Sequence, residues 1–234
     1  MIDSGLIDLR FGRWQDVLAD VTECDALITD PPYSERTAKG YRNGTDSDDL
    51  SGISYGSITE GDATEIASFW ARRVQRWTVI FADHIAWRWH EAAWEREGRY
   101  TFAPVIWAKI AAPPRLRGDG PASQVDHIMI ARPRSLPPDG HRRGWYKADT
   151  PRHGHGQGVT GNKDPEAMRA LIRDYTRRGD LVVDPYAGSG TTAIACAIEG
   201  RRCITAECDP KHYEIARKRI AAGWTPDLPG VAEA

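Results

Sequence analysis

The stretch LVVDPYAGSGTT, residues 181–192, joins an apolar run to a glycine-rich turn and then to a helical pattern. The apolar run predicts a buried strand, and Gly188 and Gly190 let the backbone turn sharply and approach a ligand closely. The helix predicted over 190–200 begins with unpaired backbone N–H groups, which favour a carboxylate or a phosphate. This strand–turn–helix unit predicts an α/β fold with a ligand site at the carboxyl end of a strand.

The strand predicted over 201–207 extends this unit toward a nucleotide site. It ends at Glu207, 17 residues beyond Gly190, near the spacing at which a carboxylate binds ribose hydroxyls. The unit therefore suits an adenosine-type ligand. The loop GSGTTA lacks the third glycine of the dinucleotide fingerprint and no GKS or GKT follows, so a tight connection without a ligand stays open as an alternative.

Strands alternate with helices along the chain, which predicts parallel βαβ units in a doubly wound sheet. Two consecutive strands have no helix between them, so we expect them to pair antiparallel. The predicted strands lie near 6–9, 25–29, 77–82, 101–108, 125–131, 181–184 and 202–207, and the predicted helices near 62–76, 84–98, 164–178, 190–200 and 209–223. Two segments, 34–60 and 136–161, are expected to be loops.

A second motif, TDPPY at 29–33, follows the predicted strand CDALIT. Neither proline has a backbone N–H, so the strand must stop there. One interpretation is a strand that ends in a turn; the other is a rigid frame that holds a flat ring against Tyr33.

Composition places the chain among globular proteins. Its 234 residues are 41% apolar and 27% charged, with four cysteines that lack CxxC spacing. We expect reduced thiols, no metal at the HGHGQG stretch (153–158), no membrane span and no signal peptide, and hence a cytoplasmic protein. Three tryptophans on the helix predicted over 84–98, Trp87, Trp89 and Trp94, are expected to pack in the core or at an interface rather than stack on bases.

Charge is distributed unevenly. Residues 109–152 hold nine Lys or Arg and four Asp, a net +5, which leaves −7 for the rest of a chain whose total is −2. A basic segment on an acidic body favours a surface that meets a polyanion. A solvated, arginine-rich loop is the alternative.

Together, TDPPY and DPYAGSGTT resemble the motifs of the S-adenosylmethionine-dependent amino-methyltransferases of DNA, which methylate the exocyclic nitrogen of adenine or cytosine. The catalytic motif (D/N/S)PP(Y/F/W) is Asp30 to Tyr33 here, and the cofactor motif DPFxGSGTT is Asp184 to Thr192 with Tyr186 in place of Phe. The chain departs from the family pattern at Asp164, where a proline is usual, and at Arg13, where an acid is usual.

The resemblance implies a fold, an architecture and a set of roles. The motif order is that of the beta-type arrangement, with a single Rossmann-like domain over 1–234, one reversed strand in seven, and 109–161 as a basic target-recognition segment. In that arrangement the strand at 181–184 lies beside the strand at 24–29, so the carboxyl ends of both are expected to share one crevice at one edge of the sheet. Asp30 and the Pro31 carbonyl would accept the N–H groups of the amine, and Tyr33 would stack on the flipped base. The implied catalytic residues are Asp30, Pro31, Pro32 and Tyr33; the implied cofactor residues are Asn162, Lys163, Asp184, Tyr186, Gly188, Ser189, Gly190, Thr191, Thr192 and Glu207; the implied DNA contacts are Arg115, Arg117, Arg142 and Arg143.

The substrate follows from the same resemblance. Asp before the two prolines favours N6 of adenine in double-stranded DNA, with S-adenosyl-L-methionine as cofactor and no metal. Cytosine N4 is the first alternative, followed by an RNA or protein methyltransferase, a DNA-binding relic and a nicotinamide oxidoreductase. A homodimer is left open because the recognition segment is short, and so is the choice between a restriction–modification, phage or orphan role.

Overall fold

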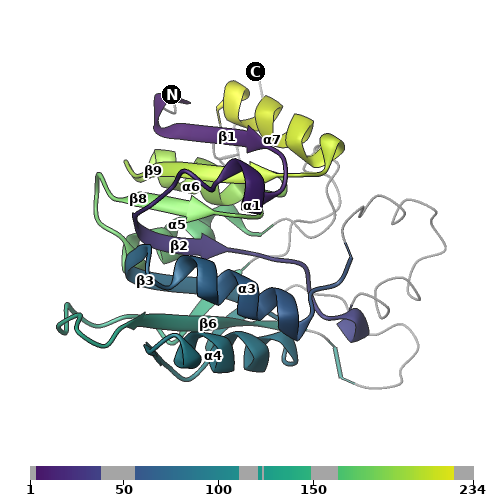
Figure 1. Ribbon diagram of the computed structural model, residues 1–234. Helices are drawn as coiled ribbons and strands as arrows, with labels where there is room; N and C mark the ends of the chain where they lie inside the picture. The colour runs from purple at the N-terminus through teal and green to yellow at the C-terminus, as the bar shows by residue number, and fades with distance from the viewer. Residues whose placement is uncertain (1–3, 38–55, 111–120, 123, 149–162, 224–234) are drawn as a thin grey trace.

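The computed structural model describes residues 4–37, 56–110, 121–122, 124–148 and 163–223, and these build one mixed sheet between two layers of helices (Figure 1). The sheet has nine strands in the order β1-β9-β8-β2-β3-β6-β5-β7, with β4 paired to β6 beside β5. The strands are β1 (Ile7–Phe11), β2 (Cys24–Thr29), β3 (Val74–Ala82), β4 (Arg99–Thr101), β5 (Val105–Lys109), β6 (Val125–Pro133), β7 (Trp145–Ala148), β8 (Leu181–Asp184) and β9 (Arg202–Glu207).

One strand of the described sheet, β6, runs against the others. It pairs antiparallel with β3, β4 and β5, whereas every other pair is parallel. This confirms the single reversed strand, and the antiparallel pairing expected between 101–108 and 125–131. The count of seven was wrong. The first of those segments is interrupted at Pro104, which lacks an N–H for the ladder, and so forms β4 and β5.

Strand β7 was not predicted: it lies inside the segment 136–161, which was expected to be a loop. Its four residues WYKA alternate between exposed and buried positions. It pairs parallel with β5 from Ile106↔Trp145 to Lys109↔Ala148. A strand this short, set between polar residues, carries almost no periodic signal of its own. The β5 edge therefore decides its conformation.

The helices cover both faces of the sheet. Figure 1 shows α3 and α4 in front and α5 and α6 behind. Helix α3 begins after Thr59, whose side chain and backbone N–H exchange hydrogen bonds with Asp62. The helix ends at Trp70 and β3 begins at Val74, so the prediction of a helix over 62–76 was wrong in its last part. The helices are α1 (Trp14–Val17), α3 (Glu60–Trp70), α4 (Ala86–Arg96), α5 (Pro165–Tyr175), α6 (Thr191–Ile198) and α7 (Pro210–Ala222), after a 3-10 turn at Ser4–Leu6.

Two apolar clusters, one on each face, form the core. The cluster beneath α3 and α4 contains Trp94, which is fully buried, with Trp87 and Trp89 packed against it. This confirms that these tryptophans pack in the core. The thiols of Cys24, Cys196 and Cys203 are free and buried, and Cys208 is free and exposed. No helix in the described part of the chain is long and apolar enough to cross a membrane.

The two sequence motifs meet because β2 and β8 are neighbours. They pair parallel in the register Ala26↔Val182 and Leu27↔Val183, so TDPPY and DPYAGSGTT both begin at the same sheet edge. Because β6 is reversed, its first residues lie at this edge too, beside the end of β5. The expectation of a shared edge is confirmed, and the sheet order places the glycine turn on one side of the prolines and β6 beyond β3 on the other.

Candidate active site

A buried hydrogen bond connects the two motifs. The Thr29 hydroxyl donates to Asp184 Oδ1 at 2.7 Å, and the backbone N–H of Tyr186 donates to the same oxygen at 3.0 Å. Burial raises the pKa of Asp184 to about 7, and the bonds from Thr29 and Tyr186 oppose that rise. The Asp184 carboxyl group, from the glycine-turn motif, is therefore hydrogen-bonded to Thr29, the residue that directly precedes Asp30.

The Asp30 carboxylate has two unlike oxygens. Its Oδ2 lies 2.8 Å from the Lys163 ammonium. Its Oδ1 is buried and has no hydrogen-bond partner among the described residues. Burial raises the pKa of Asp30 more than the neighbouring Lys163 and the Tyr33 hydroxyl lower it. Since a buried acceptor without a donor is costly, Oδ1 is suited to receive an N–H group from a ligand.

The segment after the prolines is fixed by Asp83, at the carboxyl end of β3. Both the backbone N–H and the hydroxyl of Ser34 donate to Asp83 Oδ2, at 2.9 and 2.5 Å. The other oxygen of Asp83 accepts the N–H groups of Ile85 and Ala86 at the start of α4. These bonds hold the pKa of Asp83 below its usual range even though burial opposes them. Tyr33 is thus held between Asp30 and an anchored Ser34.

The glycine turn adopts the conformation that its sequence predicts. Gly188 and Gly190 have φ of 53° and 81°, a region that favours glycine. A Cβ at Gly190 would lie 3.3 Å from that of Ala216 in α7. Gly188 donates its N–H to Glu207 Oε2 at 2.8 Å. The glycine turn therefore packs closely against α7 and lies beside Glu207, the carboxylate that was expected to bind ribose.

Glu207 is buried at the end of β9. Its second oxygen, Oε1, accepts the N–H of Asp209 at 2.8 Å, and burial raises its pKa. Each carboxylate oxygen has a further lone pair. Both oxygens are thus oriented by the backbone before any hydroxyl arrives, which is the state that binding a ribose requires.

Tyr186 and Pro32 line one small hollow of about 150 Å³, together with Gly56, Ser57, Ile58 and Asp62. The Tyr186 hydroxyl accepts a bond from the Trp14 indole at 3.1 Å, and burial raises its pKa to about 12. The tyrosine that stands in place of Phe thus has a buried partner for its hydroxyl. One residue from each motif faces the same space.

The start of α6 carries a positive group that the sequence did not indicate. Arg219 of α7 donates to the Ser189 carbonyl at 2.6 Å and lies 3.3 Å from the Thr191 hydroxyl. Ser189, Thr191 and Thr192 are all buried, and Thr192 also bonds the Asp184 carboxylate. An arginine there adds to the helix dipole and favours an anionic ligand group.

The structure places Lys163 against Asp30. Lys163 precedes Asp164, whose side chain caps α5 by accepting the N–H of Ala167 at 2.8 Å. This cap gives a physical reason for the aspartate that replaces the family's proline. Asn162, which was expected beside Lys163, lies outside the described residues.

Arg142 and Arg143 lie at the other end of the strands from Asp30. They precede β7, which is parallel to β5, so they lie at the amino end of those strands, roughly 15 Å or more along the sheet. Arg142 is 15% exposed, bonded to Asp139 and stacked 4.1 Å above the Trp77 ring. Their DNA contacts stay a prediction that this position does not favour; Arg115 and Arg117 lie outside the described residues.

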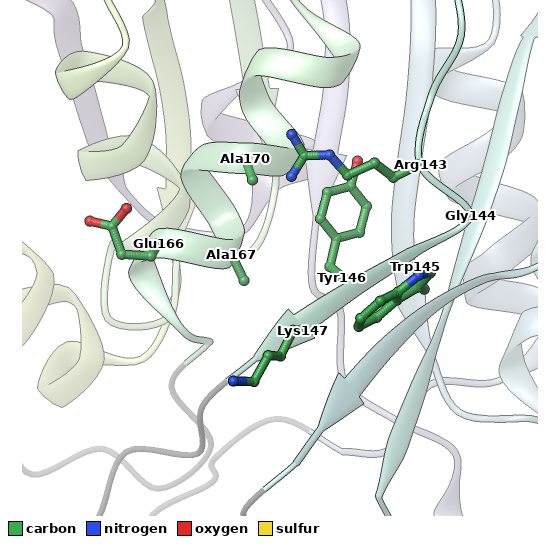
Figure 2. A pocket seen from close by; sticks show the side chains of 8 residues that line it. All are labelled: Arg143, Gly144, Trp145, Tyr146, Lys147, Glu166, Ala167 and Ala170. Carbon is green, nitrogen blue, oxygen red and sulfur yellow. The ribbon is translucent and has the colours of Figure 1, made fainter.

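A larger hollow of about 480 Å³ lies between β7 and α5, away from both motifs (Figure 2). Arg143 and the rim residue Trp145 lie on its β7 side, and Glu166 lies on its α5 side. Arg143 pairs with Asp174 at 3.2 Å. The prolines and the glycine turn do not line it, so it plays no part in the site described above.

Sequence comparisons place the chain near known methylases. Residues 24–218 match the sequence model of a family described as DNA methylase, of the N6/N4 methyltransferase type. A putative methylase of Escherichia coli K12, YubD, is 25% identical over 207 residues, which cover 85% of this chain and 82% of that protein. The type II methyltransferase M.XycI of Xanthomonas campestris pv. cyanopsidis is 28% identical over 142 residues, 55% of this chain and 47% of that protein. The chain thus spans about half the length of M.XycI.

Solved structures share the fold. M1.HpyAVI, in a complex with SAM, superposes with a TM-score of 0.70 at 21% identity and covers 92% of this chain and 98% of its own. The cytosine-N4-specific PvuII DNA methyltransferase gives 0.67 at 14% identity, with 95% and 88% covered. Both confirm the Rossmann-like architecture.

Proposed function

The chain belongs to the N6/N4 DNA methylase family, and from this membership we propose that it transfers a methyl group from S-adenosylmethionine to the exocyclic amino group of a base in DNA. The observation that supports this most directly is the unpaired, buried Asp30 Oδ1 at the end of TDPPY. The other oxygen of the same carboxylate is already held by Lys163. One oriented acceptor is therefore left for an N–H donor.

The residues around the glycine turn fit the cofactor. A buried carboxylate oriented by Gly188 and Asp209 suits the ribose hydroxyls. The helix start near Thr191, with Arg219 behind it, suits the anionic methionine end. When bound, S-adenosylmethionine supplies an activated methyl group on a sulfonium. The chain's own task is then to place the amine and stabilise its charge.

Asp30 and its neighbours can do both. An amine on an aromatic base is a weak nucleophile because its lone pair is delocalised into the ring. A carboxylate that accepts one N–H orients the amine and stabilises the positive charge that develops on nitrogen. Tyr33, held by Ser34 and Lys163, offers a ring on which an extruded base can stack, an interaction worth about 1–3 kcal/mol.

Adenine N6 is the base atom that we propose. The support is Asp30 in the first position of the motif, where an acid is the commoner residue among adenine enzymes of the resembled family. Cytosine N4 is the second candidate, because one structural neighbour is described as cytosine-N4-specific. Both amines would use the same carboxylate in the same way.

Substitution of Asp30 tests the proposal. Asp30→Ala should abolish methyl transfer to DNA and leave binding of S-adenosylmethionine, measured by calorimetry, within a few-fold of the wild type. Asp20→Ala is the matched control, because Asp20 is a carboxylate exposed by 67% that pairs with Arg10. Full transfer by the Asp30 variant would refute the assigned role; loss of activity in both variants would point to a loss of folding.

A further inference from the structure

Four side chains of alternating charge form a line that ends at Asp30. Lys109 Nζ lies 2.8 Å from Asp126 Oδ1, Asp126 Oδ2 lies 3.5 Å from Lys163 Nζ, and Lys163 Nζ lies 2.8 Å from Asp30 Oδ2. They come from β5, β6, the residue before the α5 cap, and the end of β2. The two lysines and Asp126 therefore join the reversed strand to the catalytic motif.

Three of the four side chains are largely withdrawn from solvent, and the fourth, Asp30, is 28% exposed at the end of the line. The side chains of Asp126, Lys163 and Lys109 are 8%, 11% and 18% exposed. Buried charges are tolerated only where they are paired, and removing one partner costs more than the pair contributes. Lys163 has a carboxylate on each side and also lies 4.7 Å from the centre of the Phe81 ring. Its position is therefore set from several directions.

The Tyr33 hydroxyl belongs to the same cluster. It accepts a hydrogen bond from Lys163 at 2.9 Å, and its single O–H, which can donate to only one carboxylate at a time, helps to lower the pKa of both Asp30 and Asp126. One ammonium group thus contacts the acceptor for the amine and the ring that would stack on the base. A residue that holds Lys163 in place therefore also positions the Asp30 carboxylate and the Tyr33 ring.

We propose that Asp126 is a positioning residue for methyl transfer, which holds Lys163 and, through it, Asp30 Oδ2 and the Tyr33 hydroxyl, while Lys109 fixes Asp126. This rests on the proposed function of Asp30. Asp126 touches Tyr33 and Lys163, and it acts on the amine through them. Its position on β6 follows from the strand reversal, which brings a residue near the start of that strand to the carboxyl edge of the others.

The arrangement has a pH signature. The charged and titratable groups that face Asp30 are Lys163, Asp126, Tyr33 and Asp184. Asp126 raises the pKa of Asp30, so a neutral residue there should lower it. Lys109 compensates Asp126, so its removal should raise the pKa of Asp30. The two substitutions are expected to shift the same group in opposite directions.

The experiment compares Asp126→Asn and Lys109→Met with the wild type. The pH dependence of kcat/KM is measured on unmethylated DNA, and the Asp30 carboxyl is titrated by carbon-13 NMR, with Asp30→Asn used for assignment. In Asp126→Asn, the acidic limb of the kcat/KM profile should move to lower pH and kcat should fall about tenfold. The KM for S-adenosylmethionine should stay within about twofold of the wild-type value. Lys109→Met should move the limb to higher pH, and Asp126→Glu should recover most of kcat.

Each outcome decides the proposal. Opposite shifts in the two variants support it; unmoved limbs, or limbs that move the same way, overturn it even if both variants lose activity. If Asp126→Asn does not fold, the shift in Lys109→Met decides. If the wild type transfers no methyl group to DNA, the proposed function fails, and the NMR titration still shows whether Asp126 and Lys109 act on Asp30.

Discussion

Replacing Thr29 by Val removes the hydroxyl that joins the two motifs and keeps the shape of the side chain. Thr29 and Asp184 are each 1% exposed, and their bond is 2.7 Å long. A bond to a charged group contributes about 1.5–3 kcal/mol to folding, and a bond between neutral groups about 1 kcal/mol. The stability loss in Thr29→Val should therefore depend on whether Asp184 is ionised.

The pH of the measurement sets that state. Burial raises the pKa of Asp184 to about 7 from 3.8, so the folded state holds the proton of Asp184 more tightly than the unfolded state does. This preference stabilises the fold fully below pH 3.8, and the contribution is lost as pH rises through 7. Asp184 is thus mostly protonated at pH 5.5 and ionised at pH 8.5. We expect Thr29→Val to cost about 1 kcal/mol at the lower pH and about 2 kcal/mol at the higher one.

Urea denaturation at the two pH values measures this difference. Thr78→Val is the matched control, because Thr78 lies on the adjacent strand, is 0% exposed, and its hydroxyl has no partner among the described residues. Removing an unpaired buried hydroxyl should be neutral or stabilising at both pH values. Equal effects of the two substitutions, or no dependence on pH in Thr29→Val, would refute the coupling of the motifs through Asp184.

Two further predictions concern the core and the glycine turn. His90 is fully buried, both ring nitrogens lack partners in the described part of the chain, and burial lowers its pKa to about 4. In the unfolded chain this imidazole takes up its proton near pH 6.5, so the free energy of unfolding should fall by about 3 kcal/mol as pH falls from 6.5 to 4. In urea titrations, the His90→Leu variant should lack this part of the loss of stability. Gly190→Ala should destabilise by about 2 kcal/mol and weaken cofactor binding in calorimetry, because its φ is 81° and its Cβ would meet Ala216 at 3.3 Å. Gly98→Ala, with φ of 77° and open space around it, should show the conformational cost alone; if the two costs are equal, the packing contribution is absent.

Local patterns predicted most of the fold. The apolar runs at β2, β8 and β9 and the glycine turn at 188–190 have strong signals, because a buried strand and a positive φ each require particular residues. β7 and the split at Pro104 escaped prediction, since short edge segments take their conformation from neighbours rather than from periodicity. Long-range pairing decided these elements.

Sequence motifs point to candidate site residues that are adjacent in the chain, but not to residues that only the fold brings beside them. Asp30, Tyr33, Asp184 and Glu207 follow from motifs. Asp83 and Asp126 do not, because a single acid at a strand end has no distinctive spacing. Lys163 was expected near the cofactor carboxylate, but its neighbours are Asp30 and Tyr33. The strand order alone determines these contacts.

The most direct test is to identify the methylated nucleoside. DNA incubated with the chain and S-adenosylmethionine carrying a labelled methyl group is digested to nucleosides and separated, with the Asp30→Ala variant as the blank. The account predicts that the label appears in N6-methyl-2′-deoxyadenosine from wild-type reactions and is absent from the blank. Label found only in N4-methyl-2′-deoxycytidine would contradict the proposed base, and label absent from DNA would contradict the proposed reaction.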